Sequence, residues 1–268
     1  MRLYGVDFTS APRRRKTITI ACGVLKDGRV RLEDFEHCAD WPRFEHFLHT
    51  PGPWCGAFDF PFGLPRELVH TLGWPTDWAA LVAHVAALGK ENFRAALNAA
   101  REARPAGQRY VHRQTDIPAR SHSPMKLVNP PVGLMFLAGA PRLLAAGLHL
   151  PGMHAGDGDR VALEAYPGLL ARAITKASYK NDNATKHTPA RQLARSQIVE
   201  ALRAGSHPLG LPLETTAPQV AAILEEGSGD LLDATLALVQ AAWATQRAGA
   251  RWGLPEDFDP LEGWIVTA

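Results

Sequence analysis

Three apolar segments of the chain each end in an acidic residue. They read YGVD up to Asp7, CGAFD up to Asp59 and VALE up to Glu164. Carboxylates are rarely buried unless they are paired with a cation or bound to a metal ion. If the three segments are neighbouring strands, their acidic ends converge and the repulsion between them requires a counter-ion.

A fourth acidic group opens the last long helical stretch, GSGDLLDATLALVQAAWA. Asp230 and Asp233 are three residues apart, so both side chains can project from one face of that helix. Each acid alone also has a structural explanation, as a turn former, as an edge-strand residue or as a charge at the positive end of a helix dipole. The recurrence of the acids after residues typical of a core favours a functional site.

Oxygen ligands alone recur in this set, and no Cys or His stands at ligand spacing beside them. His46 and His49 share one helical face, but no third ligand is evident, so a polar helix face explains them better. Oxygen ligands select a hard ion, and the acids therefore predict a site for Mg²⁺ or Mn²⁺. Two such ions ~4 Å apart can activate a water and stabilise the leaving oxygen of a phosphodiester.

The pattern of the remaining chain predicts the elements that would hold these acids. Strand-like runs occupy 3–8, 17–25, 29–35, 54–58 and 161–165, and helical stretches occupy 78–104, 135–147, 168–175, 189–203, 218–226 and about 229–247. Asp40 is the expected N-cap of a further short helix, and KDG at 26–28 predicts a tight hairpin turn. The alternation predicts a single α/β domain over 1–268, with a helical insertion at about 61–160.

Composition excludes several classes of protein. A formal net charge of +2 over 268 residues is too small to indicate a general nucleic-acid binder, so any basic surface must be local. Cys22, Cys38 and Cys55 are far apart and form no CxxC pair, which argues against a disulfide framework or a structural zinc site. We expect neither a signal peptide nor a membrane span, and we expect a cytoplasmic protein.

Three basic segments are candidates for binding phosphate. From Arg94 to Lys126 the chain carries seven Lys or Arg residues against two acids. RRRK at 13–16 and YKNDNATK at 179–186 are the others, although solvated surface loops explain all three segments as well. The predicted substrate-binding residues are Arg113, Arg120, Lys126 and Lys180.

The acidic motifs also resemble those of a known family. They read GVDFT (5–9), FDFPFGLP (58–65), EAYP (164–167), DLLDA (230–234) and EGWI (262–265), in that order over nearly the whole chain. This pattern resembles domain-of-unknown-function family 429, an uncharacterised family described as predicted nucleases of the ribonuclease H-like fold.

The resemblance implies a mixed sheet whose first three strands are antiparallel, followed by parallel strands between helices. It places the first and fourth strands side by side, which would bring Asp7 next to Asp59. The D-x-x-D-A motif favours Asp233 over Asp230 as a ligand. The predicted catalytic and metal-binding residues are thus Asp7, Asp59, Glu164 and Asp233, with Asp230 as a further metal ligand, in a nuclease acting on DNA or RNA.

Two other functions remain open from the sequence. DFTS after the first strand and EGSGD at 226–230 faintly resemble the phosphate-binding loops of an ATP-dependent phosphotransferase of the actin-like kind, although 8–10 contains no glycine. The acids can also stabilise a non-catalytic scaffold by binding a cation. A nuclease that cleaves phosphodiester bonds is the function we expect.

Overall fold

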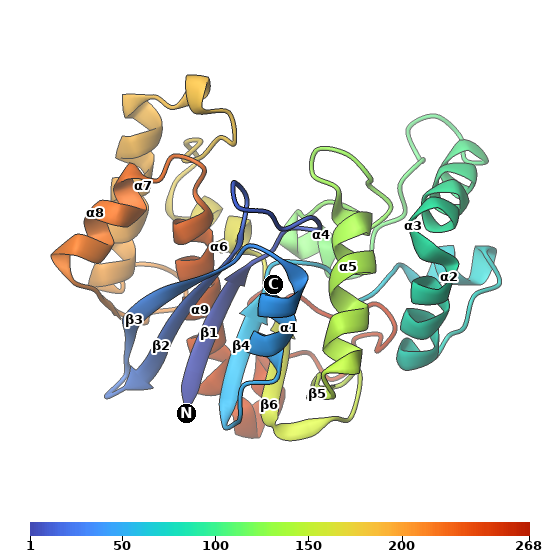
Figure 1. The fold of residues 1–268 in the computed structure, drawn as a ribbon, viewed down its shortest axis with the longest axis horizontal. Helices are drawn as coiled ribbons and strands as arrows, with labels where there is room; N and C mark the ends of the chain where they lie inside the picture. The colour runs from blue at the N-terminus through green and yellow to red at the C-terminus, as the bar shows by residue number, and fades with distance from the viewer.

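A seven-stranded mixed sheet forms the centre of the molecule (Figure 1), whose computed structural model describes residues 1–268. The strand order is β5-β6-β4-β1-β2-β3-β7. The strands are β1 (Arg2–Asp7), β2 (Ile18–Lys26), β3 (Arg29–Cys38), β4 (Trp54–Phe58), β5 (Leu148–His149), β6 (Asp157–Glu164) and β7 (Leu213–Glu214).

Strand directions bring three chain segments to one edge of the sheet. β1, β2 and β3 pair antiparallel, and the hairpin between β2 and β3 turns at Asp27 and Gly28, both with positive φ. β1 pairs parallel with β4, and β4 pairs parallel with β6. The predicted α/β class, with antiparallel strands first and parallel strands later, is confirmed. The C-terminal ends of β1, β4 and β6 therefore meet.

Helices cover both faces of the sheet (Figure 1). One core contains α1 (Trp41–Leu48), α2 (Arg66–Thr71), α3 (Trp78–Glu102) and α5 (Val132–Ala145); the other contains α6 (Pro167–Ile174), α7 (Pro189–Ala204), α8 (Ala217–Glu225) and α9 (Asp230–Thr245). Asp40 caps α1 as predicted, because its carboxylate accepts a hydrogen bond from the Arg43 amide. None of the helices combines the length and the apolar character that a membrane span requires.

The segment predicted as a helical insertion, at about 61–160, contains α2, α3, α4 (Asp116–Ala119), α5 and the short edge strand β5. Its long helices begin and end close to the predicted stretches 78–104 and 135–147. The chain between them, 103–131, runs back to the sheet edge where β1, β4 and β6 end. β5 and β7 were not predicted, because two residues are too few to show an alternating pattern.

Helix α9 lies directly against β1, and a glycine makes this approach possible. A Cβ atom at Gly5 would lie 2.1 Å from the carbonyl oxygen of Ala234 and 2.1 Å from the amide nitrogen of Leu238. Alternate residues of a strand face the same side of a sheet, so Asp7 faces α9 as Gly5 does. The close packing therefore holds the first turn of α9 beside the end of β1.

We predict that Gly5→Ala destabilises the protein by about 3 kcal/mol or more, because the added methyl group collides with the backbone of α9. Denaturation by urea measures the change. Gly158→Ala is the matched control, since no atom lies within 4 Å of its added Cβ. Equal stability of the two variants would contradict the packing described here.

Candidate active site

Three of the predicted acids lie where neighbouring parallel strands end. Asp7 is the last residue of β1, and Asp59 follows β4. The amide of Asp59 donates to the carbonyl of Val6 at 2.9 Å, which extends the pairing of β4 with β1. Glu164 ends β6 and pairs in register with Phe58 of β4. The expectation that Asp7 and Asp59 come from adjacent strands is confirmed.

Asp7 and Asp59 are the acids without a protein partner. Asp7 is buried and Asp59 is half-buried, and neither side-chain carboxylate accepts a hydrogen bond from another protein group. Burial, together with the carboxylates of Asp233 and Asp230, raises the pKa of Asp7 well above its ordinary value. Burial and Asp233 raise the pKa of Asp59 to about 7. These two groups therefore carry an uncompensated cost of ionisation.

Asp233, in the first turn of α9, is fully buried beneath two residues of a distant segment. The Tyr179 hydroxyl donates to its Oδ1 at 2.6 Å, and the Lys180 ammonium donates to its Oδ2. Burial alone would lower the pKa of Lys180, but Asp233 and the other acidic groups around it raise this pKa well above its ordinary value. Gly229 packs against the aliphatic part of the Lys180 side chain. A Cβ atom added at Gly229 would lie 2.6 Å from the Cβ atom of Lys180.

Asp230, one turn earlier, has a lysine of its own. The Lys16 ammonium lies 2.7 Å from Asp230 Oδ1 and 3.0 Å from Asp182 Oδ1. Lys16 belongs to the connection between β1 and β2, so this contact ties that loop to α9. Each acid of the α9 N-terminus is thus neutralised by a lysine from elsewhere in the chain.

Glu164 is neutralised differently, by a buried arginine. Arg113 is 2% exposed and makes two hydrogen bonds to the carboxylate, from Nη1 at 2.8 Å and Nη2 at 2.7 Å. Arg113 also pairs with buried Asp116 at 2.9 Å, and the Phe62 amide donates to Glu164 at 2.9 Å. Burial raises the pKa of Glu164, and Arg113 opposes this shift. Glu164 therefore has its hydrogen-bond partners within the protein.

Glu262 extends this network, and its role was not predicted. Its carboxylate accepts from the amides of Arg66 and Gln114, at 2.8 and 2.7 Å, and its carbonyl accepts from Arg113 at 3.0 Å. Glu262 opens the EGWI motif, which is a signal of the family and by itself indicates no role for this carboxylate. Asp116, the other buried partner of Arg113, belongs to none of these sequence motifs, so no local pattern indicated its role.

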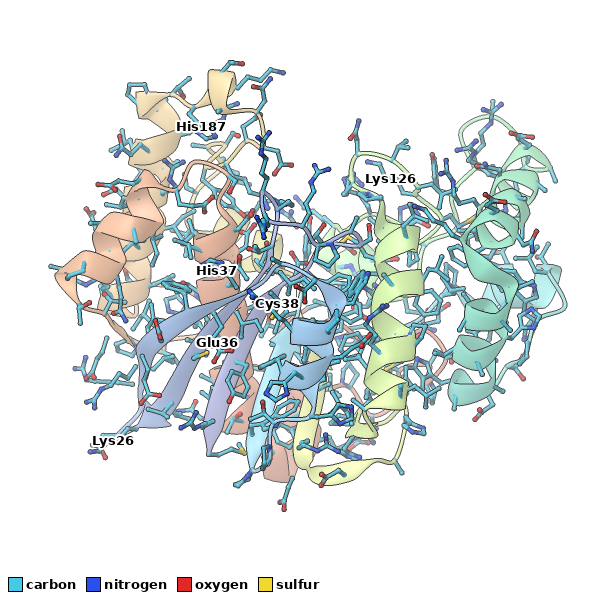
Figure 2. All side chains as sticks on the ribbon, in the orientation of Figure 1. Lys26, Glu36, His37, Cys38, Lys126 and His187 are labelled. Atoms are coloured by element: carbon cyan, nitrogen blue, oxygen red, sulfur yellow. The ribbon has the colours of Figure 1, made fainter.

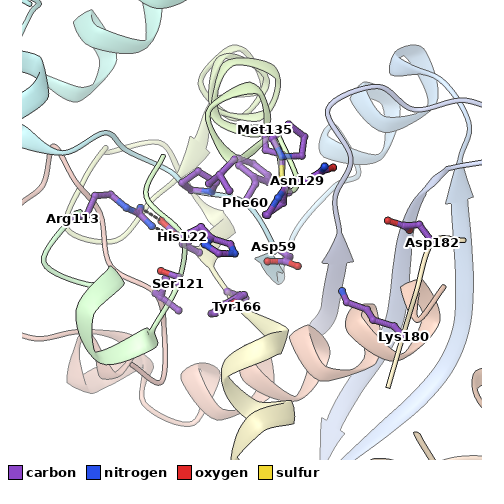
Figure 3. Close-up of a pocket in the computed structure, with 17 residues that line it drawn as sticks. Asp59, Phe60, Arg113, Ser121, His122, Asn129, Met135, Tyr166, Lys180 and Asp182 are labelled. Atoms are coloured by element: carbon purple, nitrogen blue, oxygen red, sulfur yellow. Dashed lines mark hydrogen bonds and ion pairs between the residues drawn. The ribbon is translucent and has the colours of Figure 1, made fainter. Parts of the chain in front are cut away.

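Two adjoining pockets form a groove over the acids, and Figure 3 shows the first of them. The His122 pocket, about 550 Å³, extends from Asp59 past His122 to Tyr166. The Lys16 pocket, about 510 Å³, extends from Asp59 past Asp7 to Lys16. Asp59 and Lys180 line both pockets, so they lie where the two halves of the groove meet.

The predicted substrate-binding residues occupy different environments. Lys180 lines the groove with a side chain that is 45% exposed. Arg113 lines the His122 pocket, but its guanidinium is committed to Glu164 and Asp116. Arg120 is exposed and Lys126 is half-buried, and neither lines the groove. Figure 2 shows Lys126 in the loop that precedes α5.

The donor set fits a hard divalent cation, although the side chains are not assembled around one. No group of three or more His, Cys, Asp or Glu side chains is arranged to hold a metal ion. The reason is visible in the contacts, because Lys180 and Lys16 lie on the α9 acids. Asp7 and Asp59 present carboxylate oxygens without partners, which is the chemistry that Mg²⁺ and Mn²⁺ prefer.

We predict that Asp59→Asn stabilises the protein in a pH-dependent manner when chelator is present. The pKa of about 7 in the folded protein exceeds the ordinary pKa of 3.8 for an aspartate, so ionisation of Asp59 destabilises the fold as pH rises between these values. The gain in the free energy of unfolding should be near zero at about pH 4 and reach about 4 kcal/mol above pH 7. Exposed Asp257→Asn is the control, and a pH-independent gain would contradict the assigned cause.

Comparison with known proteins gives one match. A family model described as "Protein of unknown function (DUF429)" matches residues 5–259. No curated protein and no solved structure matches the chain.

Proposed function

The chain belongs to the DUF429 family, whose description assigns no function, and from the geometry of the groove we propose a divalent-metal-dependent nuclease that hydrolyses phosphodiester bonds of nucleic acid. The observation that carries the proposal is the pair Asp7 and Asp59. Both are carboxylates without protein partners at the ends of adjacent parallel strands, and burial together with repulsion from the Asp233 carboxylate opposes the charge on each of them. A cation between the strand ends would relieve this repulsion.

Asp7, Asp59 and Asp233 would hold the Mg²⁺ or Mn²⁺, with Asp230 as a further ligand and Glu164 beside them. When bound, the cation would supply Lewis-acid stabilisation of the charge that develops on the phosphate during hydrolysis. The proposed ribonuclease H-like architecture is supported by the strand order, since β1 lies between antiparallel β2 and parallel β4.

The protein's own cations have separate roles in this proposal. Lys180 and Lys16 line the groove and are exposed enough to contact phosphate oxygens, which positions a nucleic-acid backbone. Arg113 acts on the protein instead, because it neutralises Glu164 and Asp116 and donates to the Glu262 carbonyl. Arg120 and Lys126 remain candidates for contacts beyond the groove.

A cytoplasmic location belongs to the same proposal. Cys22, Cys38 and Cys55 are all free thiols, as is usual for proteins of a reducing compartment.

We predict that Asp7→Asn lowers metal-dependent cleavage by about 100-fold or more, because metal ligation depends on each charged ligand. Hydrolysis of labelled single-stranded DNA and RNA with Mg²⁺ or Mn²⁺ measures the loss. Asp257→Asn is the control of equal charge change.

Near-normal metal-dependent cleavage by Asp7→Asn would contradict the assignment of Asp7 as a ligand of the catalytic metal. If the wild-type protein transfers phosphate from ATP and cleaves no nucleic acid, the phosphotransferase hypothesis replaces the nuclease hypothesis. If the protein binds the metal and shows neither activity, the hypothesis of a non-catalytic scaffold replaces it.

We also predict that Lys180→Met binds Mg²⁺ or Mn²⁺ about 10-fold more tightly than the wild type, because the ammonium competes with the metal for Asp233. The variant should melt at a lower temperature in chelator, since Asp233 is then buried without its counter-ion, and added metal should reverse this loss. Calorimetric titration and thermal melting measure the two effects.

Lys26→Met is the control for this experiment, because Lys26 lies at the hairpin end of β2, at the opposite end of the sheet (Figure 2). Unchanged metal affinity in Lys180→Met would show that Lys180 and the metal do not share Asp233.

A further inference from the structure

We propose that the His122 pocket receives one unpaired nucleobase, so that the substrate is a single-stranded segment of nucleic acid. The inference rests on the proposed nuclease function and specifies its substrate class. It comes from the shape and lining of the groove on the two sides of Asp59.

The walls of the His122 pocket suit a flat, apolar face. Phe60 and Met135 lie on one side of the pocket and Tyr166 on the other, as Figure 3 shows. Tyr166 and Met135 are half-buried, so each leaves part of its surface to the pocket. Aromatic side chains bind bases of any sequence by stacking, since every base has a π-face.

The rim of the same pocket supplies polar groups for the edge of a base. His122 and Asn129 are exposed there, and the Asn129 amide has no hydrogen-bond partner within the protein. Partial burial of the imidazole and the nearby Lys126 lower the pKa of His122, which favours its neutral form. His122 Nε2 lies 3.4 Å from Lys126 Nζ, so the imidazole has its other ring nitrogen left for a base, whereas the Asn129 amide offers both a donor and an acceptor. The rim can therefore hydrogen-bond a base without requiring one sequence.

The Lys16 pocket has a different lining that suits a sugar-phosphate backbone. It is lined mainly by polar groups, among them Thr9, Ser10, Asn181 and Lys16. Because Asp59 and Lys180 line both pockets, a nucleotide with its base in the His122 pocket has its phosphate near Lys180 and Asp59. The strand would then continue into the Lys16 pocket.

This arrangement disfavours a base that remains within a duplex. A volume of about 550 Å³ is in the range of sites for one small molecule and is much too small for a double helix. A paired base has to leave its stack to enter such a pocket, whereas a single strand has little stacking to lose.

The test compares binding of a five-nucleotide single strand with binding of an abasic backbone of equal length. Fluorescence anisotropy is measured with chelator and again with Ca²⁺, using DNA and RNA as separate arms. We expect the wild type to bind the base-bearing strand about 10-fold more tightly than the abasic one, in at least one arm. Tyr166→Ala should abolish this difference, and Tyr166→Phe should keep it.

Tyr110→Ala is the control, because Tyr110 is 39% exposed and does not line the pocket. Circular dichroism checks the fold of each variant, and Met135→Ala replaces Tyr166→Ala if the latter does not fold. Equal affinity of the wild type for normal and abasic strands, or no binding of either, would overturn the proposal. A base-dependent difference that survives both Tyr166→Ala and Met135→Ala would also overturn it.

The outcome is separable from that of the nuclease assay. Base-dependent binding without metal-dependent hydrolysis would support the pocket and refute the nuclease function. Hydrolysis by a protein that binds abasic and normal strands equally would support the nuclease function and refute the pocket.

Discussion

Repulsion among buried carboxylates is the constraint on which the site depends. The sheet brings the ends of β1, β4 and β6 together, and α9 adds two more acids to the same edge. In a medium of low dielectric constant such charges cannot all ionise without compensation. Glu164 is compensated by contact with Arg113, Asp233 by Lys180 and Asp230 by Lys16, whereas Asp7 and Asp59 have no such contact and keep raised pKa values despite the nearby Lys180. The uncompensated pair marks the position where chemistry is expected.

The compensating cations come from three distant parts of the chain, and each of them holds its own loop against the acids at the sheet edge. Arg113 belongs to the segment between α3 and α5, Lys180 follows α6, and Lys16 precedes β2. Each loop is thereby fixed to the sheet edge by a charge contact. The Glu262 carboxylate also accepts hydrogen bonds from backbone amides at the start of α2 and at Gln114, which hold the C-terminal segment against these two parts of the chain. The acidic edge thus shapes the groove above it.

The sequence was sufficient for the family and the α/β class, because buried strands and the acids that end them are local patterns. The parallel strands after the antiparallel start were implied by the family resemblance and not by these patterns. The ion-pair partners of those acids could not be predicted from local sequence patterns. Arg113 was predicted to bind substrate because it lies in a basic, loop-like segment, yet it pairs with Glu164, 51 residues away. Pairing across such separations depends on the three-dimensional arrangement, and nothing in the local pattern distinguishes a buried arginine from a solvated one. Nuclease activity stays a proposal.

The two contacts of Lys16 respond differently to the solvent. Asp182 is 81% exposed, so its ion pair with Lys16 is weak and is screened by dissolved salt, whereas Asp230 is 16% exposed and is screened less. The first contact joins the loop before β2 to the loop after α6, and the second joins it to α9. Rising ionic strength therefore weakens the contact between the two loops at the outer rim of the groove more than the contact between Lys16 and α9. The width of the groove at this rim depends on dissolved salt, whereas the position of the acids beneath it does not.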